Sequence, residues 1–194
     1  ELVKTMKVTP AGDTDFDLPM GPFQYQAVPG LYDKRVVGAE TELVDAVETS
    51  VNAARKEGAS RVSGVVIFRT WERFVLTSQG AEGSDRGTEV ETTVRAFAAD
   101  DASGQGNSLA TSLGLFDPEG AGRTAGKIAK MALNPQQGNP GKFNVVFGPS
   151  IFANLLNRVG DSASAYTVDL GLSFFGNMIG QKVASEIFTL HDDS

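Results

Sequence analysis

The sequence predicts an α+β fold in which a mostly antiparallel sheet carries helices on one face. Helical periodicity over residues 41–57 and again after residue 117 brackets a stretch in which strand patterns follow one another directly. Runs of strands between helices are typical of α+β domains, whereas a doubly wound fold alternates the two. Residues 88–99 alternate apolar and polar side chains, as expected for an antiparallel strand with one face in water.

Apolar stripes and end signals define the predicted helices. Gly58 follows the first stripe as a stop signal, and Asp117 with Pro118 supplies an N-cap residue and a proline at the first helical position. Four helical segments are predicted: residues 41–57, 118–132, 148–156 and 173–188.

The predicted strands are rich in β-branched and aromatic residues. Two of them form a hairpin that turns at Trp71, and a polar, glycine-rich loop over residues 79–87 leads to the next strand. A turn over residues 100–107 separates that strand from its successor, and the last strand is short and buried. The predicted strands are residues 61–70, 72–78, 88–99, 108–116 and 143–147.

Composition excludes several kinds of chemistry. The chain has 194 residues, no cysteine, one histidine and a net charge of −7. It therefore has neither the histidines for a histidine-based zinc site nor the cysteines for a thiolate one. Scattered basic residues and the negative charge argue against nucleic-acid binding. No apolar run approaches the roughly 18–20 residues that span a bilayer.

Other candidate motifs have simpler explanations. Asp100 and Asp101 lie in a predicted turn, where aspartate bonds its own backbone. The glycine-rich residues 80–87 lack the Gly-Lys-Ser/Thr ending of a phosphate loop. His191 lies near the chain end beside Asp192 and Asp193, and we interpret it as a solvated residue.

Three sequence blocks carry a resemblance to a known protein family. Residues 141–156 read Gly-Lys-Phe-Asn-Val-Val-Phe-Gly-Pro-Ser-Ile-Phe-Ala-Asn-Leu-Leu, similar to a family strand and helix. Residues 173–193 resemble the family block that contains Lys-Val-Ala-Ser-Glu and ends in Asp-Asp. Residues 79–97 are similar to a family loop and outgoing strand. Together these blocks resemble the PmbA/TldD family, and the resemblance covers residues 40–194.

The residue patterns and the resemblance together divide the chain into three regions. They are residues 1–39, an irregular extended segment; residues 40–140, an α+β domain with antiparallel strands; and residues 141–194, the start of the family's C-terminal peptidase-like domain. Family members are longer at both ends, so the resemblance also implies a central fragment. It further implies a cytoplasmic location.

The resemblance also bears on the metal. TldD-type members hold it on a His-Glu-x-x-x-His helix, whereas PmbA-type (TldE-type) members lack that motif and associate with TldD-type subunits. Here Asn157, Arg158 and Ser162 stand at the motif positions. An amide is a poor zinc ligand, and an arginine repels a cation and cannot act as a general base. No catalytic or metal-binding residue is therefore expected in this chain.

The resulting expectation is a non-catalytic PmbA-type subunit of a peptide-degrading metalloprotease. Zinc is expected in a TldD-type partner, and the chain is expected to bind that partner or its own copies, and a peptide, with Asp161 and Ser173 as contact residues. Two alternatives stay open. One is a carboxylate-based metal hydrolase that uses Asp161, Asp169 and Glu186. The other is a regulatory protein-binding module related to a modulator of DNA gyrase.

Overall fold

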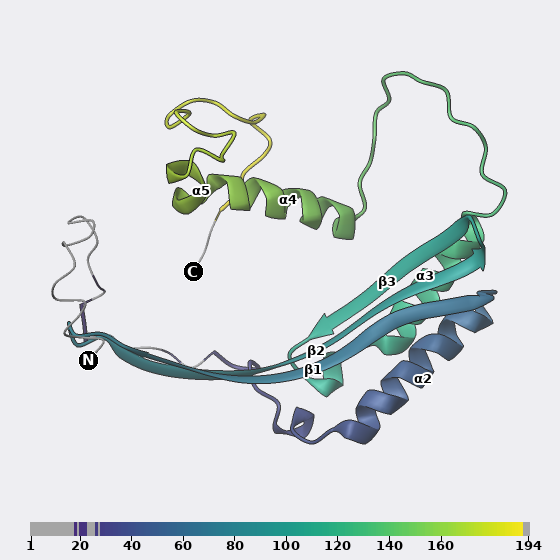
Figure 1. The fold of residues 1–194 in the computed structure, drawn as a ribbon, viewed down its shortest axis with the longest axis horizontal. Helices are drawn as coiled ribbons and strands as arrows, with labels where there is room; N and C mark the ends of the chain where they lie inside the picture. Colours follow the sequence, from purple (N-terminus) through teal and green to yellow (C-terminus); the bar gives the residue numbers. More distant parts are fainter. Residues whose placement is uncertain (1–17, 19, 23–25, 27, 192–194) are drawn as a thin grey trace, which may run out of the picture. The chain divides into compact units, whose positions relative to one another are not determined.

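A computed structural model describes residues 18, 20–22, 26 and 28–191 (Figure 1). The chain divides into two compact units, Glu1–Gln137 and Gly138–Ser194. Most of the predicted irregular segment, residues 1–39, lies outside the described residues. Among the described residues, no helix is long and apolar enough to cross a membrane.

The first unit is a three-stranded antiparallel sheet with two helices on one face, which confirms the predicted fold class (Figure 1). Its elements are, in order, the 3-10 turn η1 (Lys34–Val36), α2 (Glu40–Lys56), β1 (Arg61–Leu76), β2 (Glu82–Ala99), β3 (Ala102–Ala110), the 3-10 turn η2 (Leu113–Leu115) and α3 (Pro118–Met131). The strand order is β1-β2-β3, with β1 and β3 at the edges.

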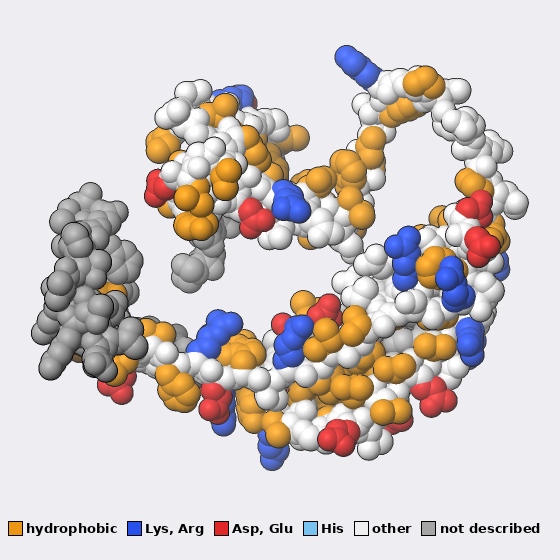
Figure 2. Space-filling model, viewed as in Figure 1, with side chains coloured by type: hydrophobic (Ala, Val, Ile, Leu, Met, Phe, Trp, Pro, Cys, Tyr) orange, Lys and Arg blue, Asp and Glu red, His pale blue; other side chains and the backbone are white. Residues whose placement is uncertain are grey.

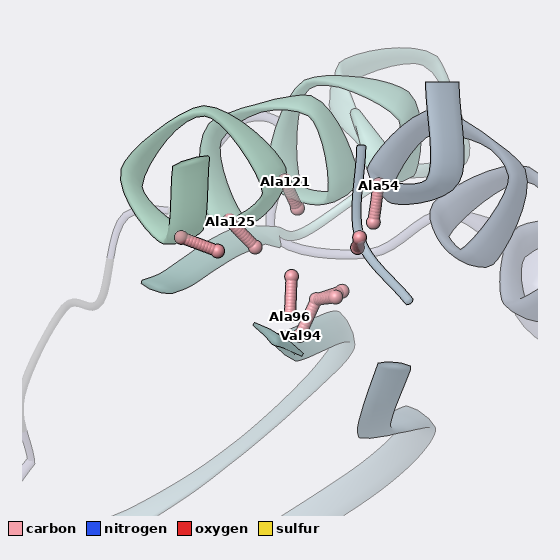
Figure 3. Packing of buried hydrophobic residues seen from close by; sticks show 7 residues of the cluster. Ala54, Val94, Ala96, Ala121 and Ala125 are labelled. Atoms are coloured by element: carbon pink, nitrogen blue, oxygen red, sulfur yellow. The ribbon is translucent and has the colours of Figure 1, made fainter. Parts of the chain in front are cut away.

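Very small residues bring both helices close to the sheet and to each other. The core cluster consists mainly of alanines from α2, α3 and the strands, and Figure 3 shows Ala54, Ala96, Ala121 and Ala125 pointing toward one another around Val94. A Cβ atom added to Gly106 would lie 2.1 Å from the Ala121 carbonyl oxygen, and one on Gly122 would lie 2.1 Å from that of Ser50. α3 therefore packs backbone against backbone on β3 and on α2.

The predicted hairpin at Trp71 is wrong, because one uninterrupted strand runs through that residue. β1 pairs with β2 without a break, and Trp71 lies opposite Gly87. A Cβ atom on Gly87 would lie 2.3 Å from the Trp71 ring, so the glycine makes room for the indole. Residues 82–87 are consequently strand and not loop. The turn lies further on, where the Thr77 N–H donates to the Ala81 oxygen over 2.9 Å and Gly80 has a φ of +82°.

The predicted turn over residues 100–107 is mostly strand. The chain reverses at Asp100 and Asp101, and β3 starts at Ala102 and ends at Ala110. Gly104 and Gly106 suggest a turn because glycine tolerates unusual backbone angles. In the structure they serve a different purpose, since each lies under the α3 backbone.

The second unit contains α4 (Pro149–Ala163) and the short α5 (Ala165–Asp169). α4 begins where the sequence predicts and continues beyond residue 156. Two predictions fail here. Residues 143–147 form no strand, and Val146 is 98% exposed. Residues 173–188 form turns instead of a helix, because Asn177 and Gly180 adopt positive φ angles of 63° and 78°.

Candidate functional site

Four of the five residues singled out from the sequence lie on α4. Asn157, Arg158 and Asp161 are exposed, and Ser162 is half-buried near the C-terminal end of the helix. Asn157 and Asp161 are one helical turn apart, as are Arg158 and Ser162, so each pair lies on one side of the helix. The positions that the family resemblance assigns to the metal motif thus lie in regular helix.

Ser173, the fifth residue, is joined directly to one of the others. Its hydroxyl donates a hydrogen bond to the Ser162 backbone oxygen and accepts one of 2.9 Å from the Phe175 N–H. These bonds hold the turn that follows α5 against the last turn of α4. The structure therefore brings Ser162 and Ser173 together, and it gives Ser173 a positioning contact that its sequence context did not indicate.

The donor set around α4 does not fit a zinc ion. Asn157 and Arg158 offer an amide and a cation where zinc needs anionic or imidazole ligands. Among the described residues, no three His, Cys, Asp or Glu side chains gather in a group that could hold a metal ion. Asp161, Asp169 and Glu186 are described and form no such group, and Glu186 pairs instead with Lys182 over 2.9 Å. His191 is exposed and lies outside helices and strands.

An apolar hollow lies beside α4 on a different side from the motif positions. It has a volume of about 1120 Å³, and Val159, Ala163, Val168, Phe174 and Phe188 contribute to its walls. None of the five predicted residues lines it, and Asp169 is the one acidic residue in its lining. Hydrophobic side chains are numerous at the surface of this unit (Figure 2).

A polar junction in the first unit was not predicted from the sequence. Thr88, which is 2% exposed, accepts a hydrogen bond of 2.8 Å from the Asp33 N–H and donates one of 2.6 Å to the Thr111 oxygen. The Asp33 carboxylate in turn accepts bonds from Arg35 and from the Leu113 N–H, the latter at 3.2 Å. Residues far apart in the sequence are thereby joined where β3 ends.

The Asp33 carboxylate makes this junction sensitive to acid. The hydrogen bond from the Arg35 side chain, followed by that from its backbone N–H, lowers the pKa of Asp33 from 3.8 to about 2. A carboxyl whose pKa is lower in the folded state stabilises the fold above its unfolded pKa, and this contribution is lost as the pH falls toward the folded value.

We therefore expect the free energy of unfolding to fall as the pH decreases from about 4 to about 2, a range set by that lowered pKa. Asp33→Asn should flatten this part of the curve, and Arg35→Gln should flatten it partly, because the guanidinium is the main cause of the shift. Urea unfolding across this pH range measures the effect. An Asp33→Asn curve parallel to that of the unmodified chain would contradict the assignment.

Comparisons with known proteins agree with the sequence blocks described above. The family model described as the PmbA/TldA metallopeptidase central domain matches residues 33–133, and that of the PmbA/TldA metallopeptidase C-terminal domain matches residues 140–194. No curated protein matches the chain.

One similar solved structure is that of a Thermotoga maritima protein named as a candidate modulator of a DNA gyrase. The two share 18% sequence identity, with a TM-score of 0.77 over 92% of this chain and 42% of the Thermotoga chain. This chain thus spans less than half the length of that protein, and at this identity the likeness shows the fold alone. Because the central-domain model alone matches more than half of the residues, the chain belongs to the PmbA/TldA metallopeptidase family.

Proposed function

We propose that this chain acts as a non-catalytic, PmbA-type (TldE-type) subunit of a TldD-type metalloprotease complex in the cytoplasm, and that it takes part in peptide proteolysis. The observation that carries the proposal is the donor set on α4: Asn157, Arg158 and Ser162, which the family resemblance aligns with the metal motif, offer an amide, a cation and a hydroxyl. A family member without ligands of its own is best explained as the partner of one that has them. The membership of a metallopeptidase family supports the link to proteolysis.

Metal and peptide chemistry are divided in this proposal. Zinc, the attacking water and the general base belong to the TldD-type subunit. This chain contributes binding surfaces, for which the exposed side chains of the second unit and the edge of the sheet are available. Asp161 is exposed on α4 and is proposed to contact the partner or the peptide, whereas Ser173 acts by holding the neighbouring turn.

Complex formation with a TldD-type subunit tests this proposal. The purified chain and a purified TldD-type metallopeptidase are mixed and separated by size-exclusion chromatography. We expect the two to elute together, and we expect the charge reversal Asp161→Lys to weaken the complex more than Glu119→Lys, which alters an exposed side chain on α3. Separate elution of the two proteins at concentrations of about 10 µM, where specific subunits associate, would contradict the proposal.

A regulatory role is the second candidate, favoured by the description of the Thermotoga protein as a candidate modulator of a DNA gyrase. The net charge of −7 disfavours contact with DNA itself, so any such effect would pass through a protein. Co-elution with gyrase subunits, and not with a TldD-type subunit, would favour this role.

A further inference from the structure

We propose that the free edge of β1 binds an extended peptide with aliphatic side chains on one face and acidic side chains on the other. This inference rests on the proposed peptide-binding role and assigns it a surface made by residues of the first unit alone. It depends on three features of the described residues: an unpaired strand edge, an apolar groove beside it, and the charge of the opposite sheet face.

The edge of β1 is open, whereas the corresponding edge of β2 is covered. β2 continues beyond the end of its pairing with β3, and there the Thr88 N–H donates to the Leu31 oxygen over 2.9 Å. At Thr88, the segment before η1 thus occupies the edge of β2 that β3 does not reach. Among the described residues, no strand pairs with the other edge of β1, which is 16 residues long.

The ladder pattern identifies the free backbone groups. Thr88 lies opposite Thr70, and its N–H points away from β1 because it bonds Leu31. In an antiparallel ladder, consecutive residues point alternately to one neighbour and to the other. The register between β1 and β2 is continuous. Every second residue of β1, counted from Thr70, therefore directs its N–H and C=O groups to the open edge. The residues with free N–H and C=O groups are Val62, Gly64, Val66, Phe68 and Thr70.

This edge lacks the usual protection against pairing. Edge strands commonly carry proline, lysine or inward-pointing charges that prevent another strand from adding. Residues 62–68, Val-Ser-Gly-Val-Val-Ile-Phe, contain no charge and no proline. The edge is therefore suited to accept an added strand, which is a recurrent mode of peptide recognition.

An apolar groove lies directly beside this edge, between α2 and the helix-facing side of β1. It has a volume of about 380 Å³, and its walls include Val47 and Val51 from α2 and Val62 and Val66 from β1. Thr92 also lines it, and its buried hydroxyl has no hydrogen-bond partner among the described residues. The groove runs beside residues 62–66 of β1, and every second side chain of a strand added along these residues would enter it; an aliphatic side chain fits its lining.

The remaining side chains of an added strand would lie on the sheet face that carries no helices, and the charges of that face determine which side chains fit. Arg61 and Arg95 both lie over the Phe97 ring, with guanidinium carbons 4.0 and 5.6 Å from its centre. Neither has a carboxylate within ion-pair distance among the described residues, whereas Glu89 and Glu91 already pair with Arg69. Arg95 lies on the central strand and donates to the Ser103 hydroxyl of β3 over 3.1 Å, so Arg61, on β1 itself, is the cation that faces an added strand. A carboxylate on the outward face of that strand complements Arg61, which selects acidic residues on this face.

Binding of a synthetic peptide tests the proposal. The probe is a fluorescein-labelled peptide of alternating valine and glutamate, measured by anisotropy with the full chain. Val47→Phe fills the groove, and because pocket contacts of one side chain change binding by about tenfold or more, we expect a loss of at least that size. Val44→Phe is the matched control, since Val44 is an exposed valine of α2 that does not line the groove, and it should leave the affinity unchanged.

Hydrogen exchange on the unmodified chain gives a second measurement that needs no variant. The peptide should slow exchange at the amides of Val62, Gly64, Val66 and Phe68, and a peptide with lysine in place of glutamate should not. Protection elsewhere, or equal losses in Val47→Phe and Val44→Phe, would overturn the proposal. So would protection of these amides that rises with protein concentration in the absence of peptide, because a second copy would then occupy the edge. Complex formation with a TldD-type subunit is measured separately, so either proposal can fail alone.

Discussion

Gly106→Val should unfold the first unit or lower its free energy of unfolding by about 3 kcal/mol or more, the upper range for overpacking a core. A Cβ atom at this position would lie 2.1 Å from the Ala121 oxygen and 3.0 Å from the Ala125 nitrogen. These are backbone atoms and cannot rotate away, so α3 would have to leave the sheet. Urea unfolding followed by the fluorescence of Trp71, the single tryptophan, measures the change.

Gly138→Val is the control for this variant. Gly138 has no heavy atom within 4 Å of an added Cβ and no positive φ, so the substitution adds the same side chain without a clash. We expect a change within about 0.5 kcal/mol, as for most surface substitutions. A Gly106→Val chain as stable as the control would show that the close packing of α3 on β3 is not required.

Thr88→Val should cost about 2 kcal/mol, because it removes one buried hydroxyl that serves two partly buried backbone groups. The Asp33 N–H would lose its acceptor and the Thr111 oxygen its donor. Valine keeps the volume and the β-branched shape, so packing in the strand changes little. Thermal or urea unfolding gives the difference, and exchange at the Asp33 amide should accelerate.

Thr92→Val provides a matched comparison on the same strand and the same face. Thr92 is fully buried, like Thr88, but its hydroxyl has no hydrogen-bond partner among the described residues. Since an unpaired buried hydroxyl costs free energy, its removal should leave stability unchanged or raise it. Equal destabilisation by the two substitutions would show that loss of the hydroxyl's bonds is not the cause.

Local signals in the sequence were sufficient for the two helices of the first unit. Asp117 predicts the start of α3 because an N-cap is made by neighbouring residues, and its carboxylate accepts a 2.8 Å bond from the Gly120 N–H. Glycines in β3 misled the prediction because the reason for them lies in α3, a separate element. Residues 143–147 are apolar enough for a buried strand, but a strand also needs a neighbour, and none among the described residues pairs with them.

The candidate sites also differ in whether neighbouring residues or separate elements of the fold determine them. Composition alone shows that the chain has a single histidine and no cysteine, and the family resemblance places the missing ligands at Asn157 and Arg158. The junction at Thr88 joins residues 55 positions apart, so no local pattern announces it. The groove between α2 and β1 depends on how far α2 covers the sheet, which the valine pattern of either element does not specify.

The zinc content of the purified chain tests most directly whether it lacks a metal centre of its own. After incubation with zinc and dialysis, metal analysis should find far less than one zinc per chain, and the same sample should cleave no peptide. Asn157→Ala should change neither result, because an amide at that position holds no metal. One tightly bound zinc per chain, lost on substitution of a residue of α4, would contradict the proposal that this chain is the metal-free subunit.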